Sequence, residues 1–180
     1  MPRDRRASIA DAAISTLASS GSRGLTHRAV DRSAGLPLGS TSYYFRTRAD
    51  LLKAAVDRLA ELDSAALELA RGDSLADDLA RVVGHLLTSE RDRLLARYEL
   101  ALESVRRPEL RQLMNAGTRR VRDVIAERLR ERQSADADSL ADDVLALIDG
   151  LLLAELTARH GGPRSRADFE SSLTRLLRSR

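Results

Sequence analysis

The stretch AGLPLGSTSYYFRTRADLL, residues 34–52, decides the fold, because it divides into short helical pieces around tight turns. A short helix is expected to follow Thr26, a good N-cap residue, until Gly35 ends it. Pro37 marks a further turn, and a second short helix is expected at about 40–45. A short helix, a tight turn and another short helix form the layout of a helix-turn-helix.

The rest of the chain shows the apolar spacing of helices, with Ala and Leu dominant and β-branched and aromatic residues scarce. A break in the first helix is expected at 19–22, and a long helix is expected to begin near Arg48. The polar segment RQSADADS, residues 132–139, is expected to be a loop, and Ser139 is expected to start a strongly apolar helix. We therefore expect an all-α protein of about nine helices.

Composition excludes several classes of protein. No apolar run approaches the roughly 20 residues that span a bilayer, and the first residues, MPRDRRASIADAAIS, lack the apolar core of a secretory signal. Cysteine is absent, which removes disulfides and thiolate chemistry, and the three histidines show no metal-ligand spacing. A cytoplasmic protein with no cofactor, no metal and no membrane partner is expected.

Charge is distributed unevenly along the chain. Residues 1–60 contain ten Lys or Arg against five Asp or Glu, a balance of +5, whereas residues 61–180 contain twenty against twenty-two, a balance of −2. A basic N-terminal third followed by a near-neutral remainder favours contact with a polyanion, although a difference of this size also arises by chance.

The second short helix suits entry into the major groove of DNA. Residues 39–42 are small and polar, so the backbone can approach base edges. Tyr43 and Tyr44 offer ring faces and hydroxyls that can donate to phosphate oxygens, and the arginines behind them can neutralise phosphates. Phe45 is expected to turn inward against the first helix of the motif. These three aromatic residues are three of only five in the chain.

Residues 8–52 resemble the TetR family of transcriptional repressors. The shared features are an alanine pair and a closing glycine in the first helix, Leu-Thr before the second, Ala-Gly at the turn, Tyr-Tyr-Phe ending the third helix, and a basic residue before Leu-Leu. In this sequence they are Ala12, Ala13, Gly21, Leu25, Thr26, Ala34, Gly35, Tyr43, Tyr44, Phe45, Arg48, Leu51 and Leu52. The resemblance implies an N-terminal three-helix helix-turn-helix DNA-binding domain, residues 1–47, and a C-terminal helical ligand-binding and dimerisation domain, residues 48–180.

The resemblance also implies which residues contact DNA. Those expected to face the bases are Gly39, Ser40, Thr41 and Tyr43, and those expected near phosphates are Thr26, His27, Arg28, Tyr44 and Arg48. Two alternatives stay open: Thr26 only caps its helix, or one of the two tyrosines belongs to the core. Where the family usually has alanine, this chain has Asp31, which either points outward to an arginine or reflects a different packing of the two helices.

In the family, the last two long helices pair with their symmetry mates as a four-helix bundle. The residues expected at such a homodimer interface are Val144, Leu147, Ile148, Gly150, Leu151, Phe169, Leu173 and Leu176. The alternative is that these helices lie inside a monomer. The middle helices, about 48–132, would enclose a pocket for an unknown small-molecule effector, with His85, Tyr98 and Met114 as candidates. A core position is the alternative for Tyr98 and Met114.

The expected function is a sequence-specific DNA-binding transcriptional regulator: a repressor that dimerises on a palindromic operator of double-stranded DNA and is released by a small molecule. A non-specific architectural DNA-binding protein is the alternative, but it would spread basic charge along the whole chain. The GDSL stretch, residues 72–75, suggests a serine esterase. Its Asp-x-x-His partner motif is absent and Ser74 suits a helix cap, so no enzyme is expected.

Overall fold

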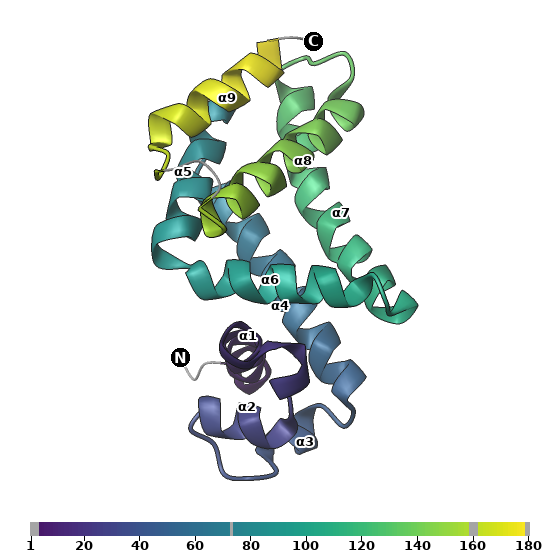
Figure 1. Ribbon diagram of the computed structural model, residues 1–180. Helices are drawn as coiled ribbons and strands as arrows, with labels where there is room; N and C mark the ends of the chain where they lie inside the picture. Colours follow the sequence, from purple (N-terminus) through teal and green to yellow (C-terminus); the bar gives the residue numbers. More distant parts are fainter. Residues whose placement is uncertain (1–3, 73, 159–161, 179–180) are drawn as a thin grey trace. The chain divides into compact units, whose positions relative to one another are not determined.

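The computed structural model describes residues 4–72, 74–158 and 162–178, and within these ranges it forms nine α-helices and no strand (Figure 1). The helices are α1 (Arg5–Gly24), α2 (His27–Ser33), α3 (Ser40–Tyr44), α4 (Arg48–Leu69), α5 (Leu75–Ser89), α6 (Arg91–Ser104), α7 (Pro108–Glu131), α8 (Ala137–Leu156) and α9 (Arg166–Arg178). The predicted all-α fold of about nine helices is confirmed.

The helices pack as two compact units. Unit 1 comprises Met1–Leu62 with Asp92–Thr118, and unit 2 comprises Asp63–Arg91 with Arg119–Arg180. The long helices α4 and α7 each contribute to both units. Unit 1 therefore combines α1, α2 and α3 with the first part of α4, nearly all of α6 and the start of α7.

Unit 1 is built around the apolar face of α1. Ile9, Ala13 and Leu17, which recur one turn apart in the sequence, are all buried, as the helical spacing predicts. Helix α1 packs on α2, and α2 packs on α3, so these three helices lie together (Figure 1). Leu25 and Leu51 complete the same core and are fully buried.

Two helix boundaries in unit 1 show how local and tertiary signals combine. The break predicted at 19–22 is only a kink at Gly21, after which α1 continues to Gly24. The Ser22 amide donates to the Glu99 carboxylate of α6 at 2.7 Å, so a tertiary contact replaces the interrupted helical hydrogen bond. Helix α4 begins at Arg48 as predicted, where Thr47 and Asp50 exchange hydrogen bonds of 3.0 Å as a capping box.

Unit 2 combines α5, α8 and α9 with parts of α4 and α7. Helix α5 packs against both α8 and α9, as Figure 1 shows. Helix α8 begins at Ala137 rather than at the expected Ser139, since the Leu140 amide already donates to the Asp136 carbonyl at 3.0 Å. Helix α9 begins with a capping box in which Ser165 and Asp168 exchange backbone and side-chain hydrogen bonds.

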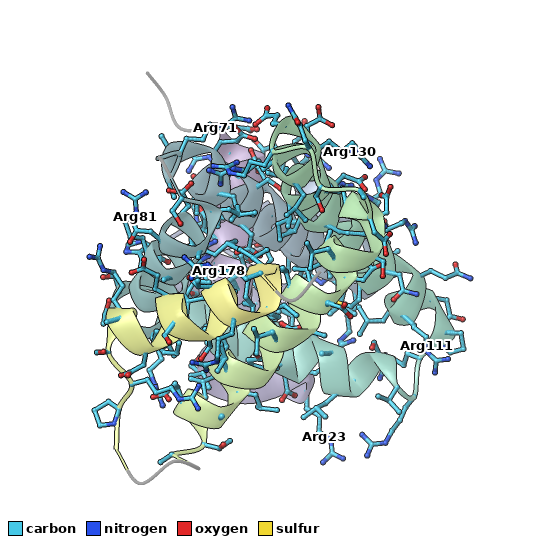
Figure 2. The ribbon with its side chains drawn as sticks, turned by 90° about the horizontal axis from the view of Figure 1, so that it is seen from above. Arg23, Arg71, Arg81, Arg111, Arg130 and Arg178 are labelled. Carbon is cyan, nitrogen blue, oxygen red and sulfur yellow. The ribbon has the colours of Figure 1, made fainter. Side chains whose placement is uncertain are left out.

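A buried ion pair lies at the centre of unit 2. The Arg128 guanidinium of α7 is fully buried; it donates to the Asp78 carboxylate of α5 and, at 3.1 Å, to the Leu67 carbonyl of α4. Asp78 also accepts from the Gly72 amide at 3.1 Å and from Arg81, which lies at the outer side of α5 (Figure 2). These polar groups join three helices inside the core of unit 2.

Within the described ranges, no helix combines the length and the apolar character that crossing a bilayer requires.

Candidate nucleic-acid interface

Helix α2 starts with the predicted cap. The Thr26 hydroxyl accepts a hydrogen bond from the Ala29 amide at 3.2 Å, so the N-cap prediction is confirmed. The Thr26 side chain is nevertheless exposed, and so is that of Arg28 two residues further on. Capping and a phosphate contact therefore do not exclude each other at Thr26.

Helix α3 starts at a position whose backbone conformation only glycine adopts without strain. Gly39 is the N-cap, with a φ of 94°, and a Cβ atom there would meet nothing within 4 Å. The positive φ and not crowding therefore selects glycine. The open space in front of Gly39 leaves the backbone at the leading end of α3 accessible to a partner, as reading base edges requires.

The Asp31 side chain of α2 binds the backbone at the start of α3. Its side chain is fully buried, and its two carboxylate oxygens accept hydrogen bonds from the Gly39 and Thr41 amides, each at 2.7 Å. The alternative in which Asp31 points outward to an arginine is thereby excluded. Gly39 itself has no side-chain cap, so a carboxylate from α2 supplies the acceptor that α3 lacks.

The surroundings of Asp31 favour its ionised form. Burial, the largest single influence, raises the pKa of Asp31, but contact with the Thr41 side chain, the two amide hydrogen bonds and the nearby His27 ring together lower it below its ordinary value of 3.8. The Thr41 hydroxyl lies beside the carboxylate without forming a well-aligned hydrogen bond. Asp31 is therefore charged at neutral pH.

His27 holds the other end of α3. Its ring donates from Nε2 to the Phe45 carbonyl oxygen at 2.7 Å, immediately after the last residue of the helix. His27 and Asp31 are four residues apart on α2 and so lie on the same face of that helix. The side chain that was predicted to hold a phosphate is thus engaged inside the protein.

The three adjacent aromatic residues point in different directions. The Tyr43 side chain is 80% exposed, Tyr44 packs partly against the core of unit 1, and Phe45 is buried as predicted. The Tyr43 and Tyr44 rings meet edge to face, with centroids 5.1 Å apart. The Arg6 guanidinium lies 4.5 Å from the centre of the Phe45 ring and donates to the Tyr44 carbonyl at 3.2 Å. Of the two tyrosines, Tyr43 is the one presented to a partner.

Two further predicted base contacts differ from their expected placement. Thr41 was expected to face the bases, but its side chain is fully buried against α2, so it cannot reach a base edge in this conformation. The reason is that Thr41 stands one turn ahead of the buried Phe45 and shares its inward face. Ser40 is half-buried, and its hydroxyl donates to the Pro37 carbonyl at 2.6 Å, which steadies the turn before α3.

The basic residues around α3 also divide into two kinds. Arg28 and Arg46 are exposed. Arg48 is half-buried and donates to the carbonyl and to the hydroxyl of Ser22, so it ties the start of α4 to the end of α1. Arg48 thus has a structural contact that the sequence did not reveal.

Sequence reasoning missed the roles of three residues in and around this site. Asp31 was noticed only as a departure from the family pattern, and nothing in the sequence identified its partners. Arg6 belongs to a different helix, and its position over Phe45 arises from tertiary packing. Leu38 is 65% exposed directly ahead of α3, where an apolar side chain was not expected to face a partner.

The residues predicted at a dimer interface lie at different depths in unit 2. Val144, Phe169 and Leu173 are buried within the single chain and Leu151 nearly so, whereas Leu147, Ile148 and Leu176 are half-buried. Gly150 is exposed, and a Cβ atom there would meet nothing within 4 Å. A partner would therefore meet the exposed side of α8 and α9, with the buried residues supporting that side from within.

The predicted effector residues belong to different units. Tyr98 and Met114 are half-buried in unit 1, where Met114 packs against the core. His85 is an exposed residue of unit 2, 3.8 Å from the Glu90 carboxylate. Unit 2 also contains a groove of about 970 Å³ with none of the three in its lining. Its residues are Ser74, Leu75, Ala76, Leu129, Arg132, Gln133, Ser134, Ala135, Asp136, Leu140, Glu170, Thr174, Leu177 and Arg178.

The GDSL serine has a structural role. The Ser74 hydroxyl accepts from the Asp77 amide at 3.4 Å and caps α5, as the sequence predicts. Among the residues that the structure describes, no three His, Cys, Asp or Glu side chains come together as metal ligands.

A chain in which a long helix supports a helix-turn-helix whose short second helix is exposed and partly polar has the layout of a DNA-binding protein. Comparison with known proteins gives the family. The model described as the tetracyclin repressor-like C-terminal domain matches residues 70–179, and the chain belongs to the TetR family of transcriptional regulators.

Individual relatives agree with this assignment. The HTH-type transcriptional regulator BetI of Paraburkholderia phymatum is 32% identical over 156 residues, which cover 83% of this chain and 80% of that protein. A TetR-family structure from Streptomyces coelicolor is 32% identical, with a TM-score of 0.78 over 96% of this chain and 98% of that one. The multidrug binding protein EbrR, complexed with ethidium, is 33% identical with a TM-score of 0.74 and the same coverage.

Proposed function

We propose that this chain represses transcription by binding a palindromic operator as a homodimer, and that a small-molecule effector releases it. The observation that carries the proposal is the exposed side of α3: open space lies in front of Gly39 at the start of the helix, and the Tyr43 side chain near its end is 80% exposed. An accessible backbone at the start of a short helix and an exposed tyrosine on the same helix are what a major-groove reader needs.

The contacts divide between bases and phosphates. Gly39 and Ser40 at the start of α3 and Tyr43 near its end read the bases. Thr26 and Arg28 at the start of α2, both exposed, hold phosphates on one side of the groove. The His27 and Arg48 side chains have internal hydrogen-bond partners and contribute to DNA binding mainly through the shape of the helix-turn-helix. Tyr44, which packs partly against the core of unit 1, contributes in the same way.

The small size of the helix-turn-helix is the reason to expect dimerisation. A single helix-turn-helix reads only a few base pairs, so specificity requires two copies on matching half-sites. The exposed side of α8, with Leu147, Gly150 and Leu153, combines apolar groups with a position where a second helix can approach closely. We place the partner subunit against this side of α8 and the neighbouring side of α9.

The effector acts by favouring a conformation in which the two helix-turn-helix motifs of the dimer do not fit the operator. EbrR is described as a multidrug binding protein, and its complex with ethidium shows that a relative of this chain binds an aromatic cation. We therefore propose an apolar or aromatic small molecule as the effector. Tyr98 and Met114 in unit 1 and His85 in unit 2 remain the candidate contacts.

Selection of bound duplexes from a random pool tests the DNA-binding proposal. Enrichment of a palindrome, bound at least about 10³-fold more tightly than random duplex at the same salt concentration, is the expected result. Equal affinity for selected and random duplexes would instead identify a non-specific architectural DNA-binding protein. A pool from which no duplex is retained would contradict both functions.

Ethidium is a suitable first probe of the effector site, because its fluorescence rises on transfer to an apolar site. We expect Tyr98→Ala to weaken ethidium binding and to reduce its effect on operator release. Thr174→Trp fills the groove of unit 2 and serves as the matched variant. If only Thr174→Trp weakens binding, the effector occupies that groove and not the surroundings of Tyr98.

A further inference from the structure

Helix α3 depends on its neighbours for its position. It contains five residues, which is far too short for a helix to be stable on its own. Both of its ends are hydrogen-bonded to one face of α2: Asp31 accepts from the Gly39 and Thr41 amides, and His27 donates to the Phe45 carbonyl. Two side chains one turn apart on α2 thus fix the start and the end of α3.

We propose that Asp31 and His27 are positioning residues for base reading, which set the orientation of α3 in the major groove without touching DNA. The proposal rests on the proposed function, in which α3 reads the operator. Asp31 is fully buried, so it acts only through the amides that it binds. The His27 ring is committed at Nε2 to a carbonyl oxygen at 2.7 Å.

Base contacts and phosphate contacts differ in how much they need this orientation. Hydrogen bonds to base edges require side chains held within about 0.5 Å and 10–20° of the productive geometry. Phosphate contacts from long, exposed arginines such as Arg28 and Arg46 tolerate larger shifts, because their charge attraction varies slowly with distance. Loosening α3 therefore reduces specific binding more than non-specific binding.

The substitution Asp31→Asn tests the start of α3. Asparagine keeps the size of the side chain, but its single carbonyl oxygen can accept from only one of the two amides, while its NH₂ group faces the other. We expect operator affinity to fall about tenfold or more, the cost of losing a base contact. Affinity for random duplex at the same salt concentration is expected to change less than about twofold, because phosphate contacts dominate it.

The pair His27→Gln and His27→Leu tests the end of α3. The glutamine Nε2 can donate to the Phe45 carbonyl much as the histidine Nε2 does, whereas leucine cannot. We expect His27→Gln to keep operator affinity within about threefold and His27→Leu to lose about tenfold, with an unchanged dependence on salt. If His27 instead holds a phosphate as a cation, both variants lower the salt slope by about one, which overturns its positioning role.

Asp11→Asn is the control for charge. It also removes one carboxylate from unit 1, but its partner is Arg58 of α4 at 2.7 Å and not a group of α3. We expect it to leave the ratio of operator to random-duplex affinity unchanged. Circular dichroism and thermal melting of every variant establish that the chain is folded at the assay temperature.

Three results would overturn the inference. Operator and random-duplex affinities of Asp31→Asn that fall in parallel would show a general structural role. An operator affinity equal to that of the wild type would show that the carboxylate does not position α3. A lower ratio of operator to random-duplex affinity in Asp11→Asn would show that the loss of a carboxylate charge alone reduces specific binding. A wild-type protein that selects no operator would overturn the proposed function itself, and that is visible before any variant is made.

Discussion

Removing the carboxylate of Asp78 should destabilise unit 2 far more than the loss of an ordinary salt bridge. The side chains of Asp78 and Arg128 are both buried, and in Asp78→Ala the Arg128 guanidinium keeps only the Leu67 carbonyl as a partner. Its Nε already has no hydrogen-bond partner in the wild type. The variant thus leaves a nearly uncompensated cation in the interior.

Breaking a buried ion pair by removing one partner costs about 3–5 kcal/mol. In a chain of this size, each kcal/mol changes the melting temperature by roughly 2–4 °C, so a fall of about 6–20 °C is expected. The double variant Asp78→Ala with Arg128→Met removes both charges and fills the space with an apolar side chain. We expect it to be more stable than Asp78→Ala alone, because no unpaired charge remains.

The assay is thermal and urea unfolding followed by circular dichroism at one fixed protein concentration, since the melting temperature of an oligomer depends on concentration. Asp77→Ala is the matched control. Asp77 neighbours Asp78 in the first turn of α5, but it is partly exposed, and its partners Arg81 and Arg166 are each 3.5 Å away. A surface pair of this kind contributes about 0–1 kcal/mol.

The reasoning would be refuted if Asp78→Ala and Asp77→Ala lowered the melting temperature equally. It would also be refuted if the double variant were the least stable of the set, because the destabilisation would then come from lost packing and not from an unpaired charge.

Three further predictions follow from the structure. Tyr43→Ala should lower operator affinity by about 1–3 kcal/mol, measured by fluorescence anisotropy, with no change in melting temperature because the ring is 80% exposed; unchanged affinity would remove Tyr43 from the reading surface. Because the pKa of Asp31 is lowered, the charge of Asp31 stabilises the folded chain above pH 3.8, and this contribution disappears as the pH falls through the pKa of Asp31 in the folded chain. The free energy of unfolding of Asp31→Asn should therefore fall less steeply than that of the wild type below pH 3.8. Identical acid profiles would contradict the hydrogen-bonded carboxylate. Leu147→Glu should yield monomers in sedimentation at micromolar concentration, whereas Leu69→Glu, at a site 87% exposed, should not; dimers in both would move the interface away from α8.

The sequence determined the helices and their caps, because those signals are local. Apolar residues that recur one turn apart, such as Ile9, Ala13 and Leu17, share one face of a helix and pack inward. Thr26 and Ser74 accept from amides three residues further along the chain. The inward position of Phe45 was also predicted from the sequence. The exposed position of Tyr43 did not, since the sequence alone could not say which of two adjacent rings faces solvent.

Only the tertiary structure decided the partners of the polar side chains. Asp31 binds amides eight and ten residues away, Arg48 reaches back to Ser22, and Arg128 pairs with Asp78 across fifty positions. Thr41 was predicted at the DNA surface and is buried, because it shares the inward face of α3 with Phe45. A charged or hydroxyl side chain can bond to any complementary group that packing brings near, so its type in the sequence predicts a need for a partner but not which partner the fold supplies.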